Sequence, residues 1–220
     1  MPTFHDLYYN LVGNDKLKPE TVNQFNLGLL FSEELGIFEF SLHTDVFTNR
    51  VKDKIVAVPT QNLFIWSMRN LGKVDITGVE IQVDVRASLT HSAGISLNLN
   101  YTHQKALDRS LPGSPTYNQQ ISYVPFQTFS GLLKLSNKSW TFGYNLLYNS
   151  HRYTLGETIP VNLLPSWMVH DIAISRQIPV KGYLFRVKAE AVNLFNKSYE
   201  VIRGFPMNGR GYYITLTINH

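Results

Sequence analysis

Apolar and polar residues alternate with a period of two along most of this chain. Residues 95–102 read I-S-L-N-L-N-Y-T, which places the apolar side chains on one face of an extended strand and the polar side chains on the other. Similar alternation marks 38–46, 79–86, 140–148, 185–191 and 212–218, with weaker copies near 21–31, 125–136 and 165–176. The pattern predicts an all-β chain of about nine long antiparallel strands and no sustained helix.

The predicted strands have the length of membrane-spanning strands. Several run for about 10 to 13 residues, whereas strands in soluble proteins most often have about 5 to 6 residues and membrane-spanning strands need about 9 to 11. Trp140 and Tyr148 stand at the two ends of one apolar face, about 26 Å apart along the strand and about 20 Å apart in height after tilting. This spacing is typical of the aromatic girdles of an outer-membrane barrel, and we assign Tyr101 to the same girdles.

The links between the predicted strands alternate in length. We expect short links near 32–36, 87–93, 137–139 and 177–183, and long links at 48–73, 104–124, 150–165 and 196–210. Outer-membrane barrels have short turns on the periplasmic side and long loops outside. This polarity directs the last strand inward and places His220 at the periplasmic rim.

The odd number of strands has a topological consequence, because single-chain bacterial barrels close with an even number. The first strand, near residue 20, and the last strand both run inward, so they cannot pair antiparallel with each other. We therefore interpret the chain as the C-terminal part of a larger barrel. Its open edges, at 21–31 and 211–219, predict aggregation or pairing with another chain.

Three stretches resemble TonB-dependent outer-membrane receptors. They are PTFHDLYY with GNDKLKPE at 2–20, LGKVDITGVEIQ at 71–82 and NLFNKSYEVIRGFPMNGRGYYITLTI at 193–218. Complete barrels of this family have about 22 strands around a plug. The resemblance implies that residues 20–220 are the last nine strands, that residues 1–19 are the remnant of an extracellular loop, and that the plug domain is absent. PTFHDLYY and RGFPMNGR also look similar to the cobalamin-receptor subgroup.

The resemblance implies an active transporter of the Gram-negative outer membrane, which imports a scarce ligand with energy supplied by TonB through the missing plug. Siderophores, haem, cobalamin and oligosaccharides are all candidate ligands. Alternate residues of the last strand also resemble the signal read by the barrel-assembly machinery, namely Tyr212, Ile214, Leu216, Ile218 and His220. That signal usually ends in Phe, so the terminal His220 implies either weaker recognition or a tolerated substitute.

Composition argues against a helical membrane protein and against a metal site. The chain has 220 residues, 44% of them hydrophobic, and no cysteine; none of its apolar runs approaches the roughly 20 residues of a membrane helix. Its seven histidines are scattered and form no metal-binding pair. We expect no cofactor, no metal and no enzyme activity. The N-terminus has no signal peptide, so an exported protein would lack its front end here.

Basic residues are concentrated in the long links, which hold eleven Lys or Arg against four acidic residues in a chain of formal net charge +4. A basic outer rim would attract lipopolysaccharide phosphates or an anionic ligand. The candidate contacts are Tyr8, Tyr9, Arg50, Lys52, Lys54, Arg109, Arg152, Arg203 and Arg210. They lie on separate links without a basic helix, which argues against nucleic-acid binding.

Charged residues on the polar strand faces belong in a wet lumen, because a midplane Arg or Lys that faces lipid costs about 2 to 4 kcal/mol. The residues expected to face inward are Glu39, Asp45, Glu80, Asp84, Arg86, Arg186, Lys188 and Glu190. The glycines of Gly204-Phe-Pro206 and Gly209-Arg-Gly211 indicate turn geometry. Three alternatives stay open: a passive porin-like barrel, a non-functional fragment, and a soluble β-sandwich binding module.

Overall fold

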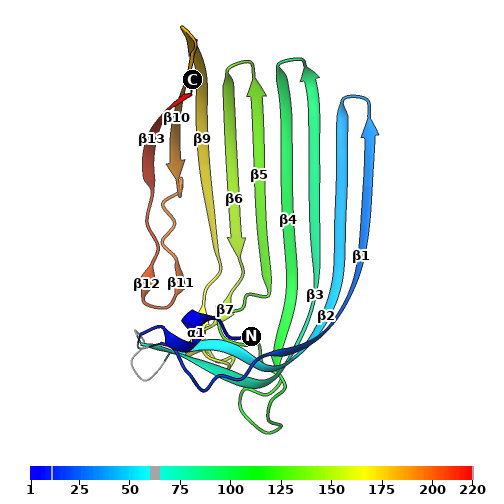
Figure 1. The fold of residues 1–220 in the computed structure, drawn as a ribbon, viewed down its shortest axis with the longest axis vertical. Helices are drawn as coiled ribbons and strands as arrows, with labels where there is room; N and C mark the ends of the chain where they lie inside the picture. The colour runs from blue at the N-terminus through cyan, green and yellow to red at the C-terminus, as the bar shows by residue number, and fades with distance from the viewer. Residues whose placement is uncertain (11, 60–64, 220) are drawn as a thin grey trace.

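One antiparallel sheet of nine strands accounts for most of the structure (Figure 1). The structure, a computed structural model, describes residues 1–10, 12–59 and 65–219. The strands are β1 (Thr21–Leu35), β2 (Phe38–Pro59), β3 (Trp66–Thr90), β4 (Ala93–Asp108), β5 (Gln127–Asn137), β6 (Trp140–Asn149), β9 (Trp167–Val180), β10 (Tyr183–Val192) and β13 (Gly211–Asn219). Each strand pairs with the next along the chain, in the order β1-β2-β3-β4-β5-β6-β9-β10-β13. The nine predicted strands are confirmed.

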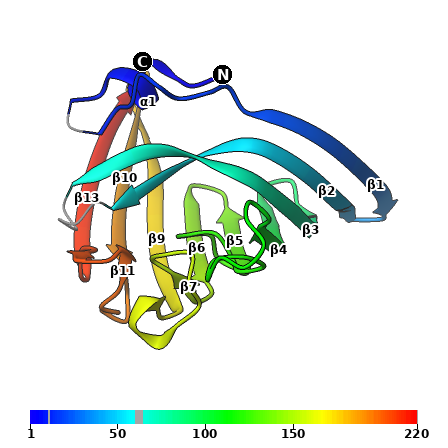
Figure 2. The ribbon, with the colours of Figure 1, turned by 90° about the horizontal axis from the view of Figure 1, so that it is seen from below.

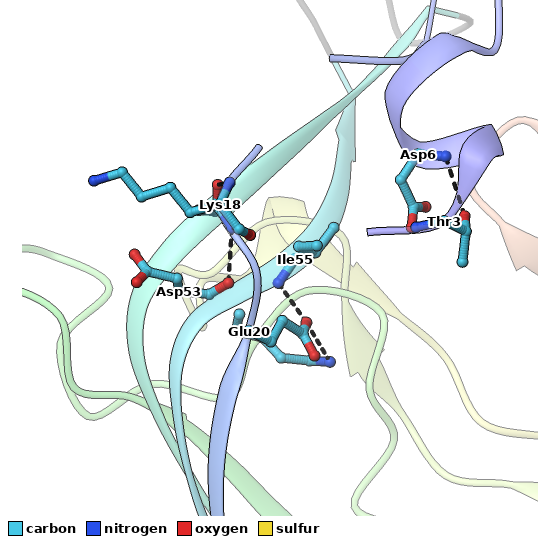
Figure 3. A network of polar contacts seen from close by, with 8 residues as sticks. Thr3, Asp6, Lys18, Glu20, Asp53 and Ile55 are labelled. Carbon is cyan, nitrogen blue, oxygen red and sulfur yellow. Dashed lines mark hydrogen bonds and ion pairs between the residues drawn. The ribbon is translucent and has the colours of Figure 1, made fainter. Parts of the chain in front are cut away.

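Shorter elements lie outside this sheet. They are α1 (Phe4–Tyr8), the 3-10 turn η1 (Pro160–Asn162), and two small ribbons, β7 (Arg152–Tyr153) with β8 (Leu163–Leu164) and β11 (Glu200–Ile202) with β12 (Phe205–Pro206). A capping box starts α1: the Asp6 N–H donates to Thr3 Oγ1 at 3.2 Å, and the Thr3 N–H donates to the Asp6 carboxylate at 2.7 Å (Figure 3). In the part of the chain that the structure describes, no helix is long and apolar enough to cross a membrane.

The strand register separates a polar inner face from an apolar outer face. Directly opposed residues of a sheet lie on one face, and one inner row joins Ser41, Asp84 and Asn98 across β2, β3 and β4. The Asp84 carboxylate accepts hydrogen bonds from Asn98 Nδ2 at 2.7 Å and from Gln82 Nε2 at 2.8 Å. The expected inward position is confirmed for Glu39, Asp45, Glu80, Asp84, Arg86, Arg186, Lys188 and Glu190.

The sheet is an open arc rather than a closed ring (Figure 2). Within the described ranges β1 and β13 each have one neighbouring strand, as the odd strand count predicts. Large apolar side chains cover the outer face, and Leu27 and Ile214 are 68% and 84% exposed. An apolar surface of this extent requires a lipid environment or a partner, because water would hydrate it unfavourably.

Short turns and long connections lie at opposite ends of the sheet (Figure 1). The short turns occupy 36–37, 91–92, 138–139 and 181–182. Lys181 and Gly182 both have positive φ, 46° and 86°, which is the backbone of a two-residue hairpin turn that matches strand twist. The predicted alternation of short and long links is confirmed.

The prediction of a loop over 48–73 is wrong in its extent. β2 and β3 stay paired through this segment, from Lys52 opposite Lys73 to Pro59 opposite Trp66. The charges in this segment obscure the alternation, but ladder hydrogen bonds join backbone groups and do not require an apolar face. Asp53, with φ 55°, interrupts the run of paired residues. The outer part of the hairpin extends across the loop end of the arc (Figures 1 and 2).

A buried hydrophobic cluster lies on the inner face at the loop end. It consists of Val51, Val74, Ala106 and Ile121. Ile121 belongs to the connection 109–126, which folds back so that the Ile121 N–H donates to the Ala106 carbonyl at 2.8 Å. In return the Ala106 N–H donates to the buried Gln120 Oε1 at 2.9 Å. This connection therefore packs on the sheet instead of extending into solvent.

Candidate functional site: the mouth of the barrel segment

The long connections gather at one end of the sheet, where they form a mouth at the end of the arc (Figures 1 and 2). We define the mouth as residues 1–20, 48–73, 109–126, 150–166 and 193–210, as far as they are described. All nine predicted ligand or lipopolysaccharide contacts belong to it. The structure brings some of them into one network and leaves others apart.

Glu20, from the LKPE stretch, fastens the N-terminal segment to the bent β2–β3 hairpin (Figure 3). Its Oε1 atom accepts hydrogen bonds from the Ile55 backbone N–H at 2.6 Å and from Lys54 Nζ at 3.0 Å. The predicted contact Lys54 is therefore held by a protein carboxylate. The Asn70 side chain, from the hairpin, also holds the N-terminal segment.

Asn70 bridges the N-terminal segment and both sides of the hairpin. Its Nδ2 atom donates to the Lys18 carbonyl at 3.0 Å and to the Asp53 carbonyl at 2.7 Å, and its Oδ1 atom accepts from the Lys18 N–H at 2.9 Å. Because Asp53 interrupts the ladder, its carbonyl needs a partner from elsewhere. The amide of Asn70 supplies that partner.

Substitution of Glu20 by alanine is expected to detach the N-terminal segment while the sheet stays folded. The Ile55 N–H loses a charged acceptor, so its opening free energy should fall by about 1 to 3 kcal/mol. Amide hydrogen exchange of Ile55 measures this change. Asp15→Ala, an exposed acidic residue in the same segment, is the control. Equal protection of Ile55 in both variants would contradict this role of Glu20.

Arg152 joins two long connections from a buried position. Its side chain is only 2% exposed, and its Nη2 atom donates to the carbonyls of Glu200 at 2.6 Å and Val201 at 2.8 Å. Burial lowers the pKa of the Arg152 guanidinium. Because the guanidinium faces protein carbonyls, Arg152 acts in this structure as a brace between β7 and β11 and offers little surface to a ligand.

Arg203, from the connection 193–210, in turn contacts the connection 150–166. Its Nη1 and Nη2 atoms donate to the carbonyls of Val161 at 2.6 Å and Leu163 at 2.8 Å. The connection 109–126 joins the same assembly through the Tyr123 N–H, which donates to the Tyr153 carbonyl at 2.7 Å. Burial raises the pKa of the Tyr123 phenol. Three connections are thus linked by backbone and arginine contacts.

Asn193 holds the junction where regular pairing of β10 with β13 ends. It is 4% exposed and has φ 48°, a conformation that Asn tolerates better than most residues. Its Oδ1 atom accepts from the Lys197 N–H at 2.8 Å, and its Nδ2 atom donates to the carbonyls of Lys197 at 2.9 Å and Asn208 at 3.2 Å. The first Asn of the NLFNK stretch therefore satisfies backbone groups that the ladder no longer pairs.

The second Asn of that stretch, Asn196, accepts a hydrogen bond from the Arg210 N–H at 2.9 Å. A Cβ atom at Gly209 would lie 2.8 Å from Asn196 Oδ1, so this position favours glycine. Gly204, with φ 79°, turns the chain between β11 and β12. The predicted turn geometry is confirmed for Gly204, whereas Gly209 does not have positive φ and Gly211 is the first residue of β13.

The remaining predicted contacts lie on several surfaces. Tyr8 and Tyr9 are exposed at the end of α1. Arg50 and Lys52 are exposed on the outer face of β2. Arg109 Nε lies 3.4 Å from an Asp75 carboxylate oxygen, and the Arg210 guanidinium lies 5.9 Å from the centre of the Tyr212 ring. Their contacts with a ligand or with lipopolysaccharide stay predictions.

The aromatic residues assigned to girdles lie on the outer face. Tyr101 is opposite Phe129, and Phe129 is opposite Tyr148, so three aromatic side chains form a row across β4, β5 and β6. Trp140 lies at the other end of β6, with the Arg176 guanidinium 5.1 Å from its ring centre. Phe129 is a member of this row that the sequence analysis omitted.

The terminal strand presents its proposed assembly signal outward. Tyr212, Ile214, Leu216 and Ile218 are 71%, 84%, 60% and 54% exposed on one face of β13. His220, the last residue of the signal, lies outside the described residues. Recognition of this strand by the assembly machinery stays a prediction.

Sequence reasoning missed two aromatic pairs at the loop end of the sheet. Trp66 packs against Tyr123 with ring centres 5.1 Å apart, and Trp167 packs against Tyr199 at 4.6 Å. Both pairs join segments distant in the sequence, so no local pattern signals them. Within the described ranges, no group of three His, Asp or Glu side chains is placed to hold a metal ion.

Comparison with curated proteins finds related transporters. The chain is 22% identical over 220 residues to the vitamin B12 transporter BtuB of Photobacterium profundum, covering 98% of this chain and 33% of that protein. It is 25% identical over 225 residues to an iron-regulated outer membrane virulence protein of Vibrio cholerae, covering 95% of this chain and 32% of that protein. The chain thus spans about a third of the length of these relatives.

Solved structures show the same fold at low sequence identity. The ferric-catecholate import receptor Fiu of Escherichia coli K12 superposes with a TM-score of 0.66 and 17% identity, over 96% of this chain and 29% of that receptor. The copper transporter OprC gives a TM-score of 0.64 with 16% identity, over 98% of this chain and 34% of that protein. The nine-stranded sheet therefore matches part of a larger barrel.

The family described as "TonB dependent receptor-like, beta-barrel" matches residues 1–194. This match confirms the resemblance inferred from the three motif stretches, together with the outer-membrane location of this family. Nearly the whole sheet and most of the mouth lie within the matched residues. The chain belongs to the TonB-dependent receptor-like β-barrel family.

Proposed function

We propose that this chain forms the C-terminal wall and part of the mouth of an outer-membrane transporter that imports a scarce ligand with TonB-supplied energy. The observation that carries the proposal is the arginine-linked set of long connections above a polar inner face, in a chain of this receptor family. Such a mouth can position a ligand, and the polar face supports a hydrated path or contact with a plug. The plug and the preceding strands would come from outside residues 1–220.

Two ligand classes are favoured by the names of the relatives. Two related proteins are named as vitamin B12 transporters, and a third is named as iron-regulated. We therefore propose cobalamin or a ferric chelate as the ligand. The aromatic pairs Trp66–Tyr123 and Trp167–Tyr199, at the loop end of the sheet, suit either large, partly flat ligand, because aromatic rings contribute wide contact area with few rotatable bonds.

The other partners follow from the same proposal. TonB would act through a plug domain outside residues 1–220. The barrel-assembly machinery would bind the outer face of β13, whose alternating side chains are exposed. The outer apolar face would contact membrane lipid.

A chimera tests the proposed function at the scale of a complete receptor. Residues 1–220 replace the corresponding third of the Photobacterium profundum transporter, and uptake of radiolabelled cobalamin and of ferric chelates is measured in hosts with and without TonB. Barrel assembly is followed by the heat-dependent gel mobility of the membrane fraction. We expect an assembled barrel and uptake that disappears without TonB.

The ligand that is taken up assigns the class. Cobalamin uptake supports the cobalamin class, and uptake of a ferric chelate alone supports the iron class. An assembled chimera that imports neither, or imports equally without TonB, would contradict the proposed function. A chimera that never assembles would contradict the placement of this chain in the barrel wall.

A further inference from the structure

The outer face of β2, β3 and β4 changes from apolar to basic toward the mouth. Starting near the short turns, opposed outer residues form the rows Leu42–Val83–Leu99, Thr44–Ile81–Tyr101, Val46–Val79–His103, Thr48–Thr77–Lys105 and Arg50–Asp75–Leu107, followed by the pair Lys52–Lys73. The apolar rows suit acyl chains, and Tyr101 marks the level where aromatic residues meet the membrane interface. The basic residues begin two rows beyond Tyr101.

We define the basic patch as Arg50, Lys52, Lys73, Lys105 and Arg109. The first four are exposed, and within the described residues none of these four makes an ion pair. Arg109 lies beside Asp75, the acidic residue at the centre of the patch, with 3.4 Å between Nε and the carboxylate. Five cationic groups against one carboxylate leave an excess of four positive charges, which equals the formal net charge of the whole chain, +4. Outside the patch and Asp75, the chain has equal numbers of basic and acidic residues.

The arrangement within the patch is unfavourable in the absence of an anion. Lys52 and Lys73 are directly opposed on the same face, and like charges in this position destabilise a sheet. Their neighbours Arg50 and Asp75 are also opposed, but the Asp75 carboxylate lies beside Arg109. An anionic group between Lys52 and Lys73 would remove the repulsion. The patch therefore has the charge, the exposure and an electrostatic reason to bind phosphate.

We infer that the basic patch binds the phosphate groups of a phosphorylated glycolipid in the outer leaflet, with its acyl chains against the apolar rows below. The position of the patch favours a lipid over an imported ligand, because these side chains lie on the outer face, away from the polar inner wall. Lys54, Arg152 and Arg203 are not part of the patch, because their charged groups contact protein oxygens. This inference does not depend on which ligand the transporter imports.

Binding of bisphosphorylated lipid A to the full 220-residue chain in detergent micelles tests the inference. The variant R50Q/K52Q/K73Q/K105Q removes four charges from the patch. The control K134Q/K138Q/K181Q/R186Q removes four charges from the inner face and the short turns. Native mass spectrometry with lipid titration should show an affinity about tenfold weaker or more for the patch variant, since each basic group near an anionic surface contributes substantially. The control should bind within about twofold of the parent chain.

The probes identify the source of the phosphate. Dephosphorylated lipid A should bind the parent chain as weakly as bisphosphorylated lipid A binds the patch variant, and millimolar inorganic phosphate should not displace the glycolipid. Displacement by inorganic phosphate would overturn the assignment to a lipid. Equal losses of affinity in the patch variant and the control would overturn the location of the site.

The variant K73E distinguishes lost binding from lost folding. It converts a repulsive pair opposite Lys52 into an attractive one, so the thermal midpoint without lipid A should stay the same or rise. The increase in midpoint caused by lipid A should at the same time shrink by about half or more. If K73E keeps the full lipid A increase, the patch does not bind the glycolipid phosphates.

Discussion

Replacing Arg152 with methionine is expected to loosen two long connections together. The change leaves the carbonyls of Glu200 and Val201 without the donor that now contacts both. Hydrogen bonds to charged groups contribute about 1.5 to 3 kcal/mol, so the local opening free energy of the β11 region should fall by about 3 kcal/mol. Amide exchange across 200–206 and 152–164 should accelerate by about two orders of magnitude.

Two further variants make this result specific. Arg152→Lys keeps the charge but cannot reproduce the planar guanidinium, so we expect it to recover only part of the protection. Arg69→Met removes an exposed arginine elsewhere in the mouth and should leave both segments unchanged. Acceleration confined to β7, with β11 unaffected, would show that Arg152 does not couple the two connections.

Asn193→Ala should have a comparable effect at the end of β10. The substitution removes three side-chain hydrogen bonds, to the Lys197 N–H and to the carbonyls of Lys197 and Asn208, from a site that is 4% exposed. It also places alanine at φ 48°, where a Cβ-bearing residue without a compensating side-chain bond is strained. We expect a local loss of about 3 to 4 kcal/mol, read as faster exchange across 194–210.

Glycine at the same position separates the two causes. Asn193→Gly removes the hydrogen bonds but adopts the positive φ without strain, so protection should lie between that of the parent chain and that of Asn193→Ala. Asn208→Ala, which keeps the backbone carbonyl used by Asn193, should behave like the parent chain. If the glycine and alanine variants exchanged at the parent rate, Asn193 would not be the residue that holds this junction.

Much of the sheet could be predicted because its signals are local. In a strand, neighbouring side chains alternate between faces. The apolar Leu97 and the polar Asn98 can therefore be assigned to opposite faces from the sequence of their own strand alone. The same property placed Glu39 and Lys188 on the inner face. A one-residue shift of register would reverse every face, and this constraint makes the alternation informative.

The β2–β3 hairpin shows where the local signal ends. Beyond Thr48 the outer side chains become charged on both strands, and a loop and a strand outside the apolar band have similar compositions. Backbone pairing continues to Pro59 and Trp66 nonetheless. The charged residues that suggested a loop lie on the outer face of a strand pair. Their position on that face is the basis for the proposed glycolipid site.

The sequence by itself determined the strand count, the two faces, the polarity of the links and the family, because periodicity and short motifs act over a few residues. Only the tertiary structure decided which basic residues are available. Arg152 was predicted as a surface contact, yet it is buried against carbonyls 48 and 49 residues further along the chain. Such contacts depend on how separate connections fold over one another, and no local pattern encodes the distance between them.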